Sequence, residues 1–447
     1  MRYIPHTEQD VREMLDVIGV GSVAELFRSI PESFRLNRPL NLPNALSEAE
    51  LFAELRRLSE KNRVCGFTSF VGAGIYDHYA PAMVDHILRR SEFYTAYTPY
   101  QPEVSQGTLQ ALFEYQTLIS QLMEMDVTNA SMYDGATGCT EAVLMARRMQ
   151  RKRSRVLMAR NVHPEFRRVT RTYMTNFLNE LDDVGFDATG RLDRADLAKK
   201  LNDETACVVV GHPNYFGVLE DLDELAKIVH EAGALLVVTF SEPVAYGILP
   251  GPGRAGADIV TGEGQSFLGA MNFGGPSLGI FCTREANVRQ MPGRVCGVTT
   301  DADGRRGFVL TLSTREQHIR REKATSNICT NQGLCALSAT VFLALMGRNG
   351  LRRLAELNLA KAEYLKNELK KVKGVELAFS GPTFNEFVVK TSHKPAADIR
   401  CDLYGKNLLA GVDLREDYPE LGSHLLLCVT ESHSRRQIDE LVAAFAS

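Results

Sequence analysis

The chain has 447 residues, of which 44% are hydrophobic, and its 51 Lys and Arg against 55 Asp and Glu leave a formal net charge of −4. This length allows two or three domains around a large apolar core, and the near-balance of charge excludes the basic surface that nucleic-acid binding requires. Nine cysteines without a C-x-x-C pair predict reduced, mostly buried thiols and no metal site.

Residues 1–60 are expected to form a helical arm that wraps on a partner or on the body of the protein. Thr7 to Asp10 and Ser47 to Glu50 have the spacing of capping boxes before apolar-periodic stretches. The first residues are charged and lack an apolar core, which indicates neither a secretory signal nor a membrane anchor. The apolar stretch 335–347 is also shorter than the ~20 residues of a spanning helix. We therefore expect a cytoplasmic protein.

Residues 61–330 are expected to form a large α/β domain. Helical periodicity occupies 107–126 and 137–150, and the basic run that follows is typical of a solvated helix end. Short β-rich runs then alternate with helical stretches such as 221–233, which predicts a mainly parallel sheet with helices on both faces. These runs are 155–160, 206–214, 234–240, 257–264 and 277–283.

Residues 331–447 are expected to contain connecting helices and a smaller α/β domain. A long amphipathic helix is predicted over 351–372 and a final helix over 435–446. Between them lie the predicted strands 375–380, 384–390 and 425–430.

The loops after the strands are the places where parallel sheets bind ligands. The turn with Gly135, Thr137 and Gly138 could hold a phosphate at a helix N-terminus, although an ordinary N-cap uses the same residues. His212 and Asn214 follow another strand, where a hydrogen-bonded loop histidine is the simpler interpretation.

Four long strings make the chain resemble a known family. They are "FVGAGIYDHYAP" at 70–81, "EFYTAYTPYQPEVSQGTLQALFEYQT" at 92–117, "YDGATG" at 133–138 and "REQHIRREKATSNICTNQ" at 315–332. They resemble the N-terminal subunit of two-subunit glycine decarboxylase, the P-protein of the glycine cleavage system. The resemblance implies the fold of type I pyridoxal-phosphate enzymes.

Gln265 stands where this resemblance places the lysine that binds the coenzyme, and Thr239 stands at the aspartate that keeps the pyridine nitrogen protonated. A glutamine amide cannot form an imine and a threonine hydroxyl carries no negative charge. No lysine occurs between positions 228 and 322 that could substitute. We therefore expect no covalently held coenzyme on this chain.

The resemblance implies that the partner is glycine decarboxylase subunit 2, which carries pyridoxal phosphate. Glycine loses its carboxyl group there, and its aminomethyl group passes to the lipoyl arm of H-protein. Sites of type I enzymes lie at the subunit interface, so a subunit without coenzyme can complete the site of its partner.

Residues 95–107 are the first segment expected to contribute to that shared site. Pro99 and Pro102 favour an extended strip before a helix that begins near Ser105. The strip would present Tyr97, Tyr100, Gln101 and Glu103 to the mouth of the cleft. The alternative is a rigid loop whose tyrosines only pack at the interface.

The second segment carries positive charge before polar side chains. Arg320, Arg321 and Lys323 precede Thr325, Ser326 and Asn327, a set suited to the coenzyme phosphate or a carboxylate across the interface. A capped helix with a solvated basic face is equally compatible.

Tyr76 and His78 are further possible supporting or structural residues. The rival functions are a purely structural or regulatory paralogue and a self-contained pyridoxal-phosphate enzyme that uses another lysine.

Overall fold

The computed structural model describes residues 5–62, 66–269, 271, 273–392 and 394–446. The chain divides into two compact units, residues 1–65 and residues 66–447. In the first unit, α1 (Glu8–Ile18) and α2 (Glu48–Ser59) both begin with the predicted capping boxes. None of the described residues of this unit is buried. Residues 1–4 of the predicted arm lie outside the described residues.

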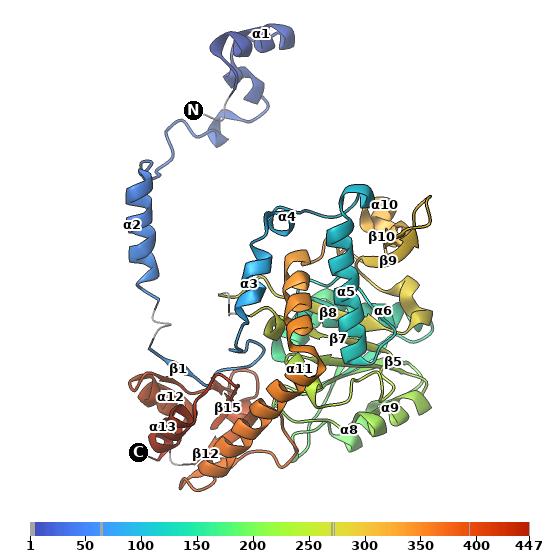
Figure 1. Ribbon diagram of the computed structural model, residues 1–447, viewed down its shortest axis with the longest axis vertical. Helices are drawn as coiled ribbons and strands as arrows, with labels where there is room; N and C mark the ends of the chain where they lie inside the picture. The colour runs from blue at the N-terminus through green and yellow to red at the C-terminus, as the bar shows by residue number, and fades with distance from the viewer. Residues whose placement is uncertain (1–4, 63–65, 270, 272, 393, 447) are drawn as a thin grey trace. The chain divides into compact units, whose positions relative to one another are not determined.

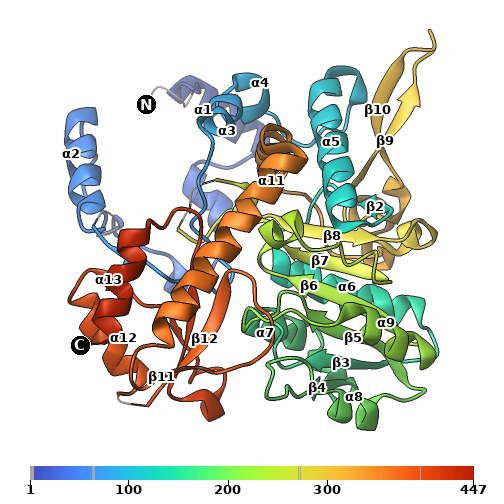
Figure 2. The same cartoon turned by 60° about the horizontal axis from the view of Figure 1, so that its bottom comes forward.

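A seven-stranded sheet forms the centre of the second unit, in the order β2-β8-β7-β6-β5-β3-β4. Figure 2 shows its strands stacked from β8 to β4. Strands β4, β3, β5, β6 and β7 are parallel, β8 runs antiparallel to β7, and β2 runs antiparallel to β8. The predicted mainly parallel sheet is confirmed. Its strands are β2 (Val127–Thr128), β3 (Arg155–Ala159), β4 (Leu181–Val184), β5 (Thr205–Gly211), β6 (Leu235–Phe240), β7 (Ile259–Glu263) and β8 (Gly279–Thr283).

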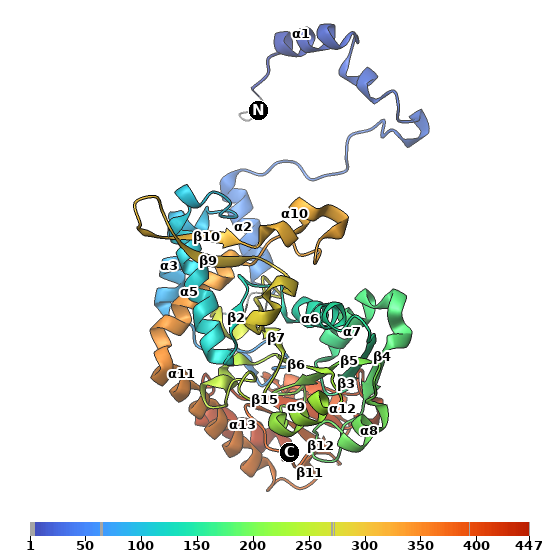
Figure 3. The ribbon, with the colours of Figure 1, turned by 90° about the vertical axis from the view of Figure 1, so that its right-hand side faces the viewer.

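Helices cover both faces of this sheet, as the sequence predicts. Figure 3 shows α6 and α7 on one side and α8 and α9 on the other. Strand β5 is buried along its whole length, which explains its unbroken apolar run, since a parallel strand is covered on both faces. The helices of this part are α5 (Gln106–Met123), α6 (Gly135–Met149), α7 (Pro164–Tyr173), α8 (Arg194–Lys200) and α9 (Leu222–Glu231).

An antiparallel hairpin, β9 (Val295–Thr300) with β10 (Arg306–Thr311), was not predicted from the sequence. In Figure 1 it lies at the same end of the body as α4 (Ser91–Tyr94) and α10 (Gln317–Arg320). Helix α3 (Ala82–Leu88) precedes α4.

Helix α11 (Gly333–Leu369) joins the large sheet to the C-terminal part and is interrupted at Gly347, which has φ 55° and ψ −175°. By length and composition α11 could cross a membrane, but half of its apolar window is buried inside the protein. The second sheet has the order β11-β12-β15-β14, and the short strands β1 and β13 pair in parallel. These elements are β1 (Thr68–Ser69), β11 (Val375–Leu377), β12 (Glu386–Thr391), α12 (Ala396–Tyr404), β13 (Leu408–Leu409), β14 (Val412–Asp413), β15 (His424–Cys428) and α13 (Arg435–Phe445).

The C-terminal part has an apolar cluster of its own, to which Phe70 and the end of α11 contribute. Eight cysteines lie among the described residues and all are free thiols; Cys329 and Cys401 are exposed and the other six are buried. The expectation that the thiols are mostly buried is therefore confirmed for the part of the chain that the structure describes.

Candidate functional site

Gln265 follows β7 at the carboxyl edge of the sheet and is 1% exposed. Its Oε1 accepts a hydrogen bond from the backbone N–H of Tyr76 at 2.9 Å, and its Nε2 donates to the backbone carbonyl of Tyr76 at 3.3 Å. The amide therefore satisfies a donor and an acceptor at once. A lysine ammonium has donors only, so a lysine at position 265 could not accept the hydrogen bond from the N–H of Tyr76.

The segment 73–79, which contains Tyr76, covers the carboxyl ends of β6 and β7. The Tyr76 hydroxyl donates to Glu386 Oε2 at 2.8 Å and lies 3.1 Å from Ser241 Oγ, just after β6. Glu386 Oε1 accepts from the N–H of Ala73 at 2.6 Å. Burial raises the pKa of Glu386 to about 7. The edge where such sheets bind ligands is thus occupied by the chain itself and bonded to the C-terminal sheet.

His78 binds two carboxylates. Its Nε2 lies 2.8 Å from Glu242 Oε2, and its Nδ1 lies 2.8 Å from Glu431 Oε2. Burial opposes a charge on the ring, but Glu242 and Glu431 more than offset this and raise the pKa of His78 to about 10. The doubly protonated ring donates from both nitrogens, so His78 joins the end of β6 to the loop after β15.

The N-terminus of α6 is the position considered above for a phosphate. Asp134 caps the helix by accepting from the N–H of Thr137 at 2.7 Å. Glu263 Oε2 accepts from the N–H of Gly135 at 3.0 Å, while its Oε1 accepts from the N–H of Leu278 at 3.0 Å. Burial raises the pKa of Glu263 to about 7. Carboxylates of the chain therefore take these N–H groups, as the N-cap interpretation requires.

These observations test whether the chain itself fits pyridoxal phosphate. Gln265 is engaged with Tyr76, and the carboxylate of Glu263 lies where a phosphate would be attracted. Thr239 is 1% exposed, and its hydroxyl has no hydrogen-bond partner among the described residues. This neutral group cannot keep a pyridine nitrogen protonated. The residues present do not fit a covalently held coenzyme.

His212 and Asn214 have structural contacts. His212 Nδ1 accepts from the N–H of Glu220 at 3.1 Å, and burial lowers the pKa of His212 to about 4. The Asn214 side chain accepts from the N–H groups of Phe216 and Val218. This is the hydrogen-bonded loop that residue types alone favoured.

The strip 95–105 lies on the surface. Tyr97 is 80% exposed and Tyr100 is 52% exposed, and Gln101 and Glu103 are also exposed. Pro102–Val104 form one 3-10 turn, so the strip is not extended throughout, and α5 begins at Gln106. The four side chains are available to a partner.

The second segment has exposed charges and half-buried hydroxyls. Arg320, Arg321, Lys323 and Asn327 are exposed, whereas Thr325 and Ser326 are half-buried. The N–H of Thr325 donates to the carbonyl of Arg315 at 3.0 Å. Burial raises the pKa of Glu141, and a hydrogen bond from Ser326 opposes that rise. Arg321 has φ 53°, an uncommon backbone conformation for a non-glycine residue.

Arg294, which the sequence did not single out, joins the strip to Asn331, which follows the second segment. It is 2% exposed and donates from one terminal nitrogen to Thr98 Oγ1 at 3.2 Å and to Asn331 Oδ1 at 3.4 Å. The other terminal nitrogen donates to the Tyr100 hydroxyl at 2.8 Å. No local sequence signal marked Arg294, because these contacts join residues about 200 or 40 positions apart.

Beside Thr98 and Asn331, two of the partners of Arg294, lies a hollow of about 220 Å³. The strip contributes Tyr97, Thr98 and Pro99, and Thr330 and Asn331, which follow the second segment, also line it. The remaining lining residues are Phe93, Tyr94, Ala96, Thr108, Ala111, Leu112, Gly333, Leu334 and Leu337. Of the candidate site residues, Tyr97 lines this hollow, whereas Tyr100, Gln101, Glu103, Arg321, Thr325, Ser326 and Asn327 are not among its lining residues.

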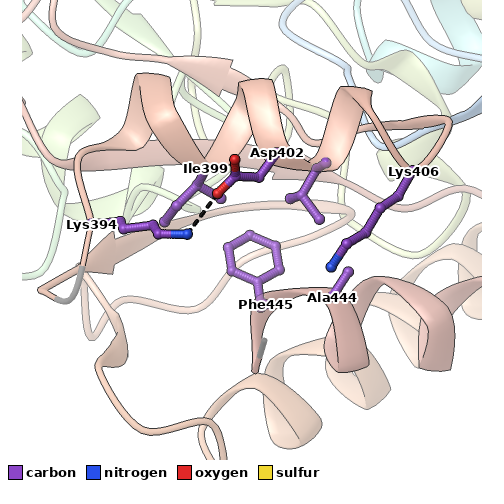
Figure 4. Close-up of a pocket in the computed structure, with 7 residues that line it drawn as sticks. Lys394, Ile399, Asp402, Lys406, Ala444 and Phe445 are labelled. Carbon is purple, nitrogen blue, oxygen red and sulfur yellow. Dashed lines mark hydrogen bonds and ion pairs between the residues drawn. The ribbon is translucent and has the colours of Figure 1, made fainter.

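Two other hollows are less suited to this chemistry. One of about 230 Å³ lies between α12 and α13 (Figure 4), where Lys394 and Asp402 are paired at 2.6 Å. Figure 1 places these helices at the opposite end of the body from α4 and α10. Another, of about 650 Å³, lies near the break in α11 and has a mixed lining of apolar side chains with Gln121, Glu124, Arg254, Arg348 and Arg352.

Comparisons with known proteins identify the family. Residues 1–445 match the model of the glycine cleavage system P-protein. The chain is 50% identical over 442 residues to a probable glycine dehydrogenase (decarboxylating) subunit 1 of Geobacillus sp. (strain WCH70), covering 99% of this chain and 98% of the relative. It is 52% identical over 449 residues to the protein with the same description in Anaeromyxobacter dehalogenans (strain 2CP-C), covering 100% and 99%.

Solved structures agree. The crystal structure of an inhibitor-bound glycine decarboxylase (P-protein) of the glycine cleavage system has a TM-score of 0.89 and 42% identity, covering 100% of this chain and 99% of that chain. A sphingosine-1-phosphate lyase of Burkholderia pseudomallei K96243, with a TM-score of 0.68, 15% identity and coverage of 93% and 94%, shows the shared type I fold alone. This family implies pyridoxal phosphate in the assembled enzyme. The chain belongs to the glycine cleavage system P-protein family.

Proposed function

We propose that this chain works as subunit 1 of a two-subunit glycine dehydrogenase (decarboxylating), and that subunit 2 carries the pyridoxal phosphate. One observation carries the proposal: the chain's own side chains and segment 73–79 fill the position where a coenzyme would bind, through Gln265 and Glu263. Its full-length similarity to proteins described as subunit 1 supports the same assignment.

The proposed reaction takes place in the site of the partner subunit. The bond from the α-carbon of glycine to its carboxylate breaks and releases carbon dioxide. The electron pair left on that carbon forms a bond to one lipoyl sulfur of H-protein, the disulfide breaks, and the second sulfur takes a proton. The coenzyme of subunit 2 would supply the electron sink for this step.

This chain would complete that site from across the interface. Tyr97, Tyr100, Gln101 and Glu103 would offer hydroxyl, amide and carboxylate groups at the mouth of the cleft. Arg321, Thr325, Ser326 and Asn327 would contact the coenzyme phosphate or a carboxylate. The exposure of Tyr97, Tyr100, Gln101, Glu103, Arg321 and Asn327, and the bonds of Arg294 to Thr98, Tyr100 and Asn331, support this proposal. We also propose that the complex works in the cytoplasm.

Borohydride trapping tests which subunit binds the coenzyme. Each subunit, alone and mixed, is incubated with pyridoxal phosphate, reduced and mapped by mass spectrometry. We expect a modified lysine in subunit 2 only, and glycine-dependent bicarbonate exchange with H-protein that needs both chains. Stoichiometric labelling of one lysine of this chain alone would instead favour the self-contained pyridoxal enzyme.

The purely structural or regulatory alternative is not favoured by the full-length similarity to proteins described as glycine dehydrogenase subunit 1. Replacing Tyr97 or Glu103 by Ala tests it directly. We expect reduced turnover in a complex that still assembles. Unchanged turnover of both assembled variants would favour the structural alternative.

A further inference from the structure

We propose that Arg294 is a positioning residue that orients the hydroxyls of Thr98 and Tyr100 as hydrogen-bond donors to an anionic oxygen in the shared site. The inference rests on the proposed function, and it names a ligand chemistry, a carboxylate or phosphate oxygen, for two hydroxyls of this chain.

Arg294 is the donor in its hydrogen bonds to the hydroxyls of Thr98 and Tyr100. A guanidinium has five N–H donors and no acceptor. In its contacts at 3.2 Å to Thr98 Oγ1 and 2.8 Å to the Tyr100 hydroxyl, Arg294 is therefore the donor and each hydroxyl oxygen is the acceptor. Asn331 Oδ1 accepts at 3.4 Å, while its Nδ2 donates to the carbonyl of Ala130 at 3.0 Å. Arg294 thus occupies an acceptor position on both hydroxyls.

The hydroxyl hydrogens of Thr98 and Tyr100 are not used in the bonds to Arg294. Each hydroxyl keeps one O–H donor after it has accepted from Arg294. Within the described ranges, neither Thr98 nor Tyr100 donates a side-chain hydrogen bond to a protein acceptor. Thr98 lines the 220 Å³ hollow, and Tyr100 is 52% exposed. Each O–H is therefore available to a ligand, that of Thr98 beside the hollow and that of Tyr100 at the exposed surface next to it.

Buried charged side chains lie next to the two hydroxyls. Arg294 and Arg315 are 2% and 8% exposed, and Glu316 is their nearby carboxylate, 3.8 Å from Arg294 Nε. The Nε atoms of both arginines are buried without a hydrogen-bond partner in the part of the chain described. Two guanidinium groups against one carboxylate leave an excess of positive charge. Charge-assisted hydrogen bonds make an anionic oxygen the favoured acceptor.

The orientation of Tyr100 is also fixed by its ring. The Arg294 guanidinium carbon lies 5.1 Å from the ring centroid, and the His318 ring contacts Tyr100 edge-on with centroids 5.9 Å apart. The phenol is therefore held on a face and an edge as well as at its oxygen. A held donor loses less side-chain entropy when a ligand binds.

Two sources supply an anionic oxygen in the proposed site, the glycine carboxylate and the coenzyme phosphate. The assembled two-subunit enzyme is prepared with Thr98→Val, Tyr100→Phe, Arg294→Lys or Arg294→Met. Two constants are measured: the KM for glycine in the exchange reaction, and the Kd of the coenzyme-free complex for pyridoxal phosphate. Tyr404→Phe, on α12 with 51% exposure, is the control for removal of an equally exposed phenol.

We expect Tyr100→Phe to raise one of the two constants about tenfold, the size of one hydrogen bond to a charged group, while Tyr404→Phe leaves both unchanged. A rise in KM identifies the carboxylate, and a rise in Kd identifies the phosphate. Arg294→Met should raise the same constant, with Arg294→Lys intermediate. Adding Tyr100→Phe to Arg294→Met should change it less than twofold further, because Arg294 acts through Tyr100.

Unchanged constants for both Thr98→Val and Tyr100→Phe would overturn the inference, and so would independent, multiplying effects of Arg294→Met and Tyr100→Phe. If Arg294→Met does not fold, the two hydroxyl variants decide, since they retain Arg294. The proposed function fails separately, if wild-type subunit 2 turns over glycine without this chain.

Discussion

Replacing Gln265 by Leu tests whether the amide has become a structural group. Leucine has a similar volume but no hydrogen-bonding atoms, so the N–H and carbonyl of Tyr76 would lose their partners at 2.9 and 3.3 Å. Both groups lie where Gln265 is 1% exposed, so water cannot readily replace the amide. A buried backbone group left without a partner costs about 1–3 kcal/mol.

The expected loss in the free energy of unfolding is about 2 kcal/mol, because two such groups cost about 2–6 kcal/mol and burial of the leucine side chain returns about 1.5–3 kcal/mol. Urea denaturation followed by circular dichroism measures the global change. Hydrogen exchange of a peptide that contains Tyr76 measures the local change, and we expect its amide to exchange at least tenfold faster.

Gln121→Leu is the matched control. Gln121 lies on α5 and is exposed, so its replacement should change stability by less than about 0.5 kcal/mol. An equally small effect of Gln265→Leu, together with unchanged exchange at Tyr76, would refute the structural role of the amide.

Three further predictions concern the same region. Thr239→Asp with Gln265→Lys should not create a coenzyme site, because segment 73–79 and Glu263 still occupy it; stoichiometric borohydride trapping at position 265 would contradict this. His78→Gln should cost about 3–5 kcal/mol at neutral pH by breaking a buried ion pair. Since the pKa of His78 is raised from 6.5 to about 10, this contribution is complete below pH 6.5 and lost as pH rises to 10, so urea titrations of the two proteins should converge there. Burial raises the pKa of Glu263 from 4.5 to about 7, so the ionised form is disfavoured in the fold and the free energy of unfolding falls as pH rises through that interval. Glu263→Gln should reduce this fall in urea titrations. A pH profile equal to that of the wild type would contradict the prediction.

Local signals in the sequence predicted most of the secondary structure. The capping residues Thr7 and Ser47 marked the starts of two helices, and the apolar run that became β5 is buried as a parallel strand should be. The hairpin β9–β10 was missed, although "DADG" at 301–304 is a turn signal, because its strands carry little of the alternation that identifies a strand.

Contacts between distant residues were beyond the sequence. The position of Gln265 was predicted, but its bond to Tyr76 joins residues 189 positions apart, and no local pattern encodes that pairing. Arg294 was missed for the same reason, since a lone arginine gives no sign of being buried. The exposure of Arg320 and Lys323 could be predicted from the sequence, because their polar neighbours along the chain indicate a solvated turn.

The pair between Gln265 and Tyr76 also bears on how such a subunit changes over time. A return to lysine at this one position would leave the N–H of Tyr76 without an acceptor and place a charge in a buried space. A lysine at position 265 would therefore carry a cost in folding before any coenzyme bound. Under the proposed function, this cost opposes the acquisition of a coenzyme lysine by this chain and keeps it dependent on subunit 2.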